Sequence, residues 1–254
     1  MFSENSFIFL NEAHKIKSND WNNSDISKLW LYNLHYFDDL NAFDAENRKK
    51  WHVDLIDNWI IKNPPINGVG WDSYPISLRI VNWIKWNLAG NSLKASWIHS
   101  LEVQTRFLSK NIENHLLGNH VFSNAKALIF AGLFFKGDES KIWYSKGLKI
   151  IQRELPEQVL NDGGNFELST MYHLIFLEDL LDIVNIHKAY AVNLSANIED
   201  RIKPMLRWMN LMCHPDGEIS FFNDAALSFA PSVDEIKSYA ERLSFINSDD
   251  LQFE

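Results

Sequence analysis

Polar, glycine-bearing clusters return at a nearly constant interval along this chain, and that interval limits the possible folds more than any other feature. The clusters are centred on Asp72, Asn119, Tyr172 and Asn223, so successive centres lie 47, 53 and 51 positions apart. Two helices of about 17 residues, with their loops, fill an interval of this length. Successive helical hairpins return the chain to the same end of the structure, so we expect the four clusters to lie together on one rim.

The segments between the clusters carry apolar residues at helical spacing, whereas the alternation typical of strands is scarce. FELST and EISFF are the only short strand candidates. Helices are expected at 46–62, 75–89, 95–112, 120–135, 138–155, 169–188, 196–212 and 232–242. We therefore predict an all-α fold, an incomplete (α/α) toroid of five or six helical hairpins. It forms a single domain over residues 1–254, with residues 1–28 as an N-terminal extension.

Charge and composition exclude several classes of function. Acidic residues outnumber basic ones by 33 to 24, which argues against nucleic acid as a partner because duplex binding requires a basic surface. No apolar run approaches the ~18 residues of a membrane span. The first residues lack the basic start of a signal peptide, so none is expected, and the compartment stays open between periplasm and cytoplasm. Eight of the ten Trp residues lie at or before Trp97, and we expect most of them in the core.

The cluster LLGNH places Asn119 and His120 directly before a helical pattern. Asn119 is predicted to be the N-cap, so free backbone N–H groups and the positive end of the helix dipole would face the loop. The Asn amide and the His ring add donors, which suits the binding of a carboxylate. The alternative is a capping Asn beside an unrelated His.

The cluster DGGNFELSTMYH places Tyr172 in the first turn of a helix capped by Ser169 or Thr170. The positive helix end is expected to favour the phenolate relative to a free pKa of ~10. Such a Tyr can exchange protons with a sugar. The alternative is a half-buried Tyr whose hydroxyl binds a backbone carbonyl.

The remaining two clusters offer groups that bind sugars. Trp71 and Tyr74 are predicted to stack on sugar faces, and Arg79 to pair with a carboxylate. Their alternative roles are a hydrophobic staple and a surface ion pair. Asn223 and Asp224 are predicted to bind hydroxyl groups, with ordinary turn chemistry as the alternative.

Together, WDSYPISLRIVNW, LLGNH, DGGNFELSTMYH and DGEISFFNDA resemble the heparinase II/III-like polysaccharide lyases and the related alginate lyases, from about Leu29 to Arg242. The resemblance implies an α/α toroid, a following β-sandwich domain, and cleavage of uronic-acid polysaccharides by β-elimination. It also implies that Asn119, with His120 nearby, neutralises the uronate carboxylate and that Tyr172 is the general acid and base. Glu167, Arg79 and His173 would orient or bind the substrate. In this family a further catalytic His comes from beyond the toroid, so the chain ending at Glu254 is expected to be the toroid part of a longer protein.

Two other functions remain open from the sequence. A glycoside hydrolase needs two carboxylates across a cleft, and Asp72, Glu167 and Asp224 are candidates. A non-catalytic glycan-binding or biosynthesis-associated module is the other. We expect no catalytic metal, because HExxH is absent and His115 and His120 are five positions apart, and we expect no cofactor. The predicted partner is an acidic polysaccharide or oligosaccharide.

Overall fold

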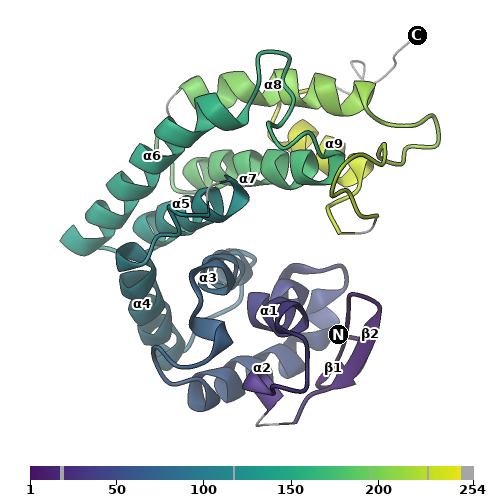
Figure 1. Ribbon diagram of the computed structural model, residues 1–254. Helices are drawn as coiled ribbons and strands as arrows, with labels where there is room; N and C mark the ends of the chain where they lie inside the picture. Colours follow the sequence, from purple (N-terminus) through teal and green to yellow (C-terminus); the bar gives the residue numbers. More distant parts are fainter. Residues whose placement is uncertain (18–19, 117, 195, 228, 247–254) are drawn as a thin grey trace. The chain divides into compact units, whose positions relative to one another are not determined.

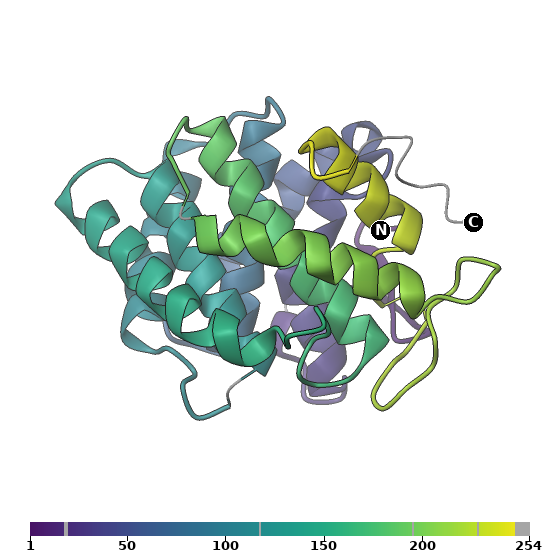
Figure 2. The same ribbon diagram turned by 90° about the horizontal axis from the view of Figure 1, so that it is seen from above.

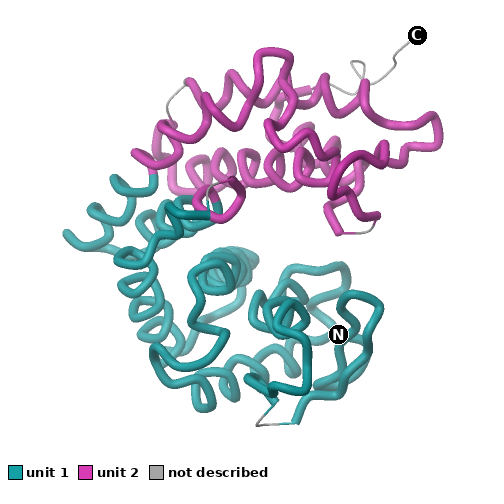
Figure 3. Tube along the Cα trace, in the orientation of Figure 1, with its two compact units in different colours: residues 1–116, 123–147 teal, residues 117–122, 148–254 magenta. Residues whose placement is uncertain are grey.

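The computed structural model describes residues 1–17, 20–116, 118–194, 196–227 and 229–246. The chain divides into two compact units (Figure 3). Unit 1 contains residues 1–116 and 123–147, and unit 2 contains residues 117–122 and 148–254. The division runs through α5 (Gly118–Phe134) and α6 (Asp138–Gln158). The single domain expected over the whole chain stays a prediction.

Unit 1 opens with an antiparallel hairpin of β1 (Ser6–Phe9) and β2 (Glu12–Lys15) (Figure 1). The hairpin is followed by α1 (Lys28–Tyr36), α2 (Lys49–Lys62), α3 (Ser73–Leu88) and α4 (Ala95–Lys110). Short 3-10 turns occur at Asp20–Asn22, Asp38–Asn41, Ala45–Arg48 and Val69–Trp71. α3 packs against α1 and α4, and α4 packs against α2. The apolar stripe of α3 is therefore in the core of the unit.

Tryptophan side chains form much of that core. Trp30, Trp59, Trp83 and Trp97 are 0% exposed. The Trp59 ring meets that of Trp83 edge to face, with centroids 5.9 Å apart, a favoured geometry for aromatic pairs. The Trp83 ring of α3 meets both Trp59 of α2 and Trp97 of α4, and the Trp30 ring of α1 meets Phe9 of the hairpin. The prediction that most Trp residues are structural is confirmed for these four.

Unit 2 is built around α7 (Thr170–Ala189), which packs against both α8 (Ala196–Leu211) and α9 (Val233–Arg242) (Figures 1 and 2). Leu177, Leu180 and Leu181 of α7 are 0% exposed, so the middle of this helix is enclosed. Its start is fixed by Ser169, whose Oγ accepts the backbone N–H of Tyr172 at 3.3 Å. The cap sets the position of the residues in the first turn.

The eight expected helices are all present, with ends that shift by a few residues. α1 was not predicted, because LWLYNLHY is apolar almost throughout and lacks a clear helical period. The two short strand candidates, FELST and EISFF, do not form strands. Leu168 in FELST has a φ of +52°, which a strand cannot contain, and in EISFF Ile219 makes a single bridge to Cys213. Among the described residues, no helix combines the length and apolar character needed to cross a membrane.

Candidate functional site

Three of the four polar clusters meet within unit 2. The backbone N–H of Asn119 donates to the Glu167 carboxylate, which joins the start of α5 to the segment before α7. Asn223 Nδ2 donates to the carbonyl oxygen of Leu168 at 2.8 Å, which joins the cluster around Asn223 to the same segment. Sequence spacing therefore identified segments that are neighbours in this unit. The remaining cluster, around Asp72, belongs to unit 1, and its convergence with the other three stays a prediction.

The start of α5 differs from the prediction in one respect. The helix begins at Gly118, so Asn119 lies in its first turn and is not the N-cap; the preceding residue, Leu117, lies outside the described residues. The N–H of Asn119 does not face an open loop, because the Glu167 carboxylate accepts it. Asn119 and His120 are both half-buried. A ligand that reaches this turn meets the Asn119 side chain and not its backbone.

Gly118 is required at this position. Its φ is +55°, a region that residues with a side chain adopt only at a cost. A Cβ atom here would lie 3.0 Å from Glu167 Oε1 and 3.7 Å from the Phe166 ring. The Gly in LLGNH thus allows both the turn into α5 and the close approach of the Glu167 carboxylate.

Tyr172 is half-buried in the first turn of α7, and the predicted Ser169 cap is confirmed. Its pKa is raised above the ordinary value, first by burial and then by the nearby carboxylates of Glu167 and Asp224. The expectation of a lowered pKa was wrong, because burial and two negative groups outweigh the positive helix end. Tyr172 therefore carries its proton at neutral pH and can donate it.

Glu167 connects these elements. Burial and the negative charge of Asp224 raise the pKa of its half-buried carboxyl group, whereas the N–H of Asn119 and the nearby His120 lower it. Its own backbone N–H donates to Asn165 Oδ1 at 3.1 Å. The carboxylate takes the place of a capping residue at the positive end of α5.

His173 does not belong to the open part of the site, contrary to the prediction. It is 1% exposed, and its Nε2 lies 3.0 Å from the carbonyl oxygen of Met205. Its ring centroid is 4.4 Å from that of Trp208, and burial lowers its pKa to about 4. Adjacent helical residues project about 100° apart, so Tyr172 and His173 leave α7 in different directions. His173 packs α7 against α8.

Arg79 is likewise structural, and its predicted pairing with a substrate carboxylate was wrong. The side chain is fully buried in unit 1. Its Nε donates to Gln104 Oε1 at 2.7 Å, and its two terminal nitrogens donate to the carbonyl oxygens of His35 and Gly70 at 3.1 and 2.8 Å. The guanidinium also lies 4.0 Å from the centre of the Trp59 ring. Each of its three nitrogens therefore donates to a group within unit 1.

Trp71 was also assigned wrongly. It is 5% exposed, its Nε1 donates to the carbonyl oxygen of Asn63 at 3.3 Å, and its ring stacks on Trp59. No face of this ring is available to a sugar. Tyr74 is half-buried and meets the Tyr36 ring edge to face at 5.8 Å, and its substrate contact stays a prediction.

Asp72, the hydrolase candidate in unit 1, is held by two neighbours. Tyr32 donates its hydroxyl hydrogen to Asp72 Oδ2 at 2.5 Å, and Lys28 Nζ lies 3.0 Å from the same oxygen.

In unit 2, the side-chain amide of Asn223 is hydrogen-bonded to the Leu168 carbonyl oxygen, and Asp224 is exposed. The roles of Asn223 and Asp224 toward substrate stay predictions.

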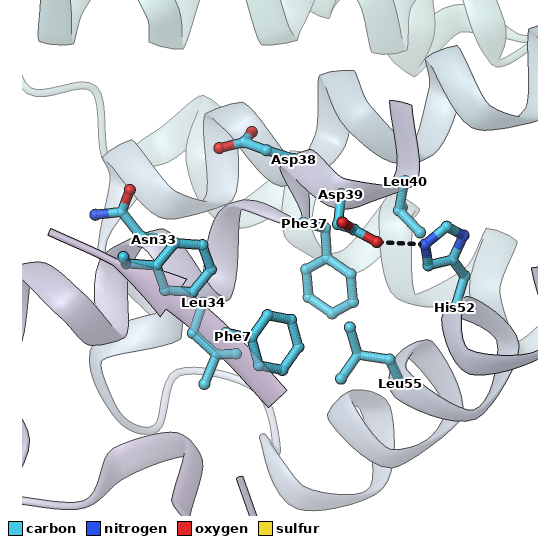
Figure 4. A pocket seen from close by; sticks show the side chains of 10 residues that line it. Phe7, Asn33, Leu34, Phe37, Asp38, Asp39, Leu40, His52 and Leu55 are labelled. Atoms are coloured by element: carbon cyan, nitrogen blue, oxygen red, sulfur yellow. Dashed lines mark hydrogen bonds and ion pairs between the residues drawn. The ribbon is translucent and has the colours of Figure 1, made fainter. Parts of the chain in front are cut away.

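A cavity in unit 1 lies between Phe7, Phe37 and Leu55 and the polar pair of Asp39 and His52 (Figure 4). His52 Nε2 is 2.8 Å from Asp39 Oδ2. The cavity volume is about 10 Å³, which is room for roughly one water molecule. It cannot hold a sugar ring, so the candidate site remains the cluster in unit 2.

Two residues of that cluster were missed by sequence reasoning. Gln158 Nε2 donates to the carbonyl oxygen of Gly118 at 3.2 Å, and Asn165 contacts both Gln158 and Glu167. Gln158 ends α6 and carries no distinguishing sequence signal. Asn165 lies in the Gly-rich DGGN turn, where a polar residue is unremarkable.

Comparison with known proteins gives consistent results. The sequence model of the family described as Heparinase II/III N-terminus matches residues 2–253. A heparin-sulfate lyase of Bacteroides stercoris is 35% identical over 114 residues, which cover 44% of this chain and 17% of that protein. A heparin-sulfate lyase of Pedobacter heparinus is 26% identical over 136 residues, covering 51% and 20%.

Solved structures show the same fold. A crystal structure of heparinase III aligns with a TM-score of 0.73 at 20% identity, over 91% of this chain and 40% of that one. The heparan sulfate lyase HepC from Pedobacter heparinus aligns with a TM-score of 0.68 at 19% identity, over 99% and 44%. The predicted all-α fold of the (α/α) toroid class is thereby confirmed. This chain spans less than half of those structures and about a fifth of the curated relatives.

Proposed function

The chain belongs to the heparinase II/III family, whose N-terminal region it matches, and on this premise we propose that it provides the Asn119–Tyr172 part of a polysaccharide lyase site. The substrate would be a uronic-acid glycan of the glycosaminoglycan type, cleaved by β-elimination. The observation that carries the proposal is the meeting of the Asn119, Glu167 and Tyr172 segments within unit 2.

The chemistry requires stabilisation of negative charge. Elimination across C4–C5 of a uronate transfers the C5 proton, which is α to the carboxylate, to a base, and electron density moves onto the carboxylate oxygens. The base would be the further catalytic His that the family resemblance places beyond the toroid. Donors that face the carboxylate lower the barrier, as in other oxyanion sites. We assign this role to the Asn119 side-chain amide, with the His120 ring beside it.

The leaving group also requires a proton. When the C4–O bond of the uronate breaks, the oxygen leaves with the departing sugar as its anomeric oxygen and needs an acid within hydrogen-bond reach. Tyr172 is suited to this role, because burial and the carboxylates of Glu167 and Asp224 keep its phenol protonated. The raised pKa of the Tyr172 phenol favours its role as general acid over a role as general base.

The substrate class rests on the relatives. The curated relatives are named heparin-sulfate lyases, and the two solved structures are named heparinase III and heparan sulfate lyase HepC. Their names support a glycosaminoglycan and do not favour the hydrolase or the non-catalytic module.

The proposal is tested by removing one hydroxyl group from the full-length protein. Tyr172→Phe is expected to abolish the ultraviolet-absorbing unsaturated product from heparan sulfate, with the circular dichroism spectrum unchanged. Tyr190→Phe is the matched control, because Tyr190 follows the opposite end of the same helix. Retention of unsaturated product by Tyr172→Phe contradicts the assignment.

A further inference from the structure

One peptide group at the start of α5 is bound at both of its ends by side chains from another segment. Its carbonyl oxygen belongs to Gly118 and accepts Gln158 Nε2 at 3.2 Å. Its N–H belongs to Asn119 and donates to the Glu167 carboxylate. Gln158 is the last residue of α6 and Glu167 lies in the connection between α6 and α7, so both side chains come from outside α5. Ordinary helix capping explains the contact of Glu167 with the Asn119 N–H but not the contact of Gln158 with the Gly118 carbonyl oxygen.

The backbone groups of Gln158 and Glu167 are both bound by the side chain of Asn165, which is 2% exposed. Asn165 Nδ2 donates to the carbonyl oxygen of Gln158 at 3.4 Å, and Asn165 Oδ1 accepts the backbone N–H of Glu167 at 3.1 Å. The N–H of Phe166 donates to the Gln158 carbonyl oxygen at 3.0 Å and closes the turn. Gln158 and Glu167 are thus presented together as a pair.

Asn223 restrains the same turn from its other side. Its Nδ2 donates to the carbonyl oxygen of Leu168, whose φ of +52° is unfavourable for a branched apolar residue. Backbone in such a conformation persists only where surrounding contacts impose it, and it is frequent at functional sites. The turn that carries Glu167 therefore has a fixed shape.

We propose that Gln158 and Glu167 are positioning residues that bind the two ends of the Gly118–Asn119 peptide and so fix the direction of the Asn119 side chain. Only the φ angle of Asn119 lies between the plane of the Gly118–Asn119 peptide and the Cα–Cβ bond of Asn119. With φ held in the helix, a fixed peptide plane therefore also fixes the direction of that bond. An oxyanion donor is effective only if it is held where the charge develops. This inference rests on the proposed role of Asn119 and extends it to two residues that need not touch the substrate.

The contact itself is tested by hydrogen–deuterium exchange at the Asn119 amide, followed by NMR. Glu167→Ala is expected to speed this exchange roughly ten- to hundredfold, the factor that corresponds to loss of one charge-assisted hydrogen bond. Glu167→Gln keeps an acceptor oxygen and should have a smaller effect. Glu157→Ala and Gln152→Ala, at exposed positions on α6, are the controls. Exchange in Glu167→Ala at the rate of the controls overturns the proposal.

The positioning role is tested by the NMR signals of the Asn119 side-chain amide and by steady-state kinetics. In the unaltered protein its Nδ2 resonances should be sharp, with cross-relaxation to the ring of Tyr172; in Glu167→Ala and Gln158→Ala these signals should weaken. In full-length protein the same variants should lower kcat at least about tenfold with little change in KM. Unchanged signals and unchanged kcat refute the role. Failure of the unaltered protein to form unsaturated product would refute the proposed function alone, because the two NMR readouts do not depend on turnover.

Discussion

Replacement of Gly118 by Ala tests the geometry at the start of α5 most sharply. The variant must hold a Cβ at a φ of +55°, which costs about 1–2 kcal/mol for a residue with a side chain. That Cβ also lies 3.0 Å from Glu167 Oε1, so the carboxylate must shift by a few tenths of an ångström. Loss of its charge-assisted hydrogen bond to Asn119 adds roughly 1.5–3 kcal/mol.

One effect opposes these costs. Ala restricts the unfolded chain more than Gly does, which stabilises the folded state by about 0.4–1 kcal/mol. The expected net loss in the free energy of unfolding is therefore about 3 kcal/mol, measured by urea titration with circular dichroism. Part of that loss comes from the backbone alone and must be separated from the contact with Glu167.

Gly217→Ala provides the separation. Gly217 is also in unit 2 and has a φ of +87°, but a Cβ there would meet nothing within 4 Å. This control should lose about 1 kcal/mol, the backbone cost less the gain from the unfolded chain. The difference of about 2 kcal/mol measures the contact with Glu167. Equal losses in the two variants refute the reasoning.

Three further predictions follow from the same contacts. Arg79→Lys is expected to lower the free energy of unfolding by about 3 kcal/mol, because Lys cannot bind the three acceptors that the guanidinium binds. The glycan affinity of the folded variant, measured by calorimetry, should stay unchanged. Weaker glycan binding by a fully folded variant would show that Arg79 contacts the substrate. His173 titrates at about 4 when folded and at an ordinary pKa of 6.5 when unfolded, so the unfolded state binds more protons between these values. Stability should therefore be complete above pH 6.5 and fall by about 3 kcal/mol as the pH drops toward 4, and the fall should be smaller in His173→Gln. Asn119→Ala should reduce kcat about a hundred- to thousandfold in full-length protein, and an effect confined to KM would contradict the oxyanion role.

The helices were predictable because the signal that specifies them is local. Apolar spacing along α3 and the Ser169 cap of α7 are both contained in a few consecutive residues. The hairpin interval also identified which polar segments meet in unit 2. α1 was missed because an apolar run without a period does not distinguish a helix from a strand.

The functions of individual polar residues were less predictable, for a physical reason. A polar residue in a helical pattern looks the same whether its side chain turns toward solvent or inward. Arg79 and His173 turn inward and find their partners on segments distant in the sequence. The pKa of Tyr172 was predicted in the wrong direction because burial, which raises it most, and the charges of residues 167 and 224 depend on tertiary contacts. Gln158 became visible only once its contact with Gly118 was seen.

The most direct measurement is the cleavage of a heparan sulfate oligosaccharide by the full-length protein in water labelled with heavy oxygen. If Asn119 and Tyr172 act together on one uronate, each cleavage leaves an ultraviolet-absorbing double bond at the new non-reducing end and places heavy oxygen at neither new end, because elimination adds no water. Cleavage that places heavy oxygen at the new reducing end, without the double bond, would show hydrolysis and contradict the account.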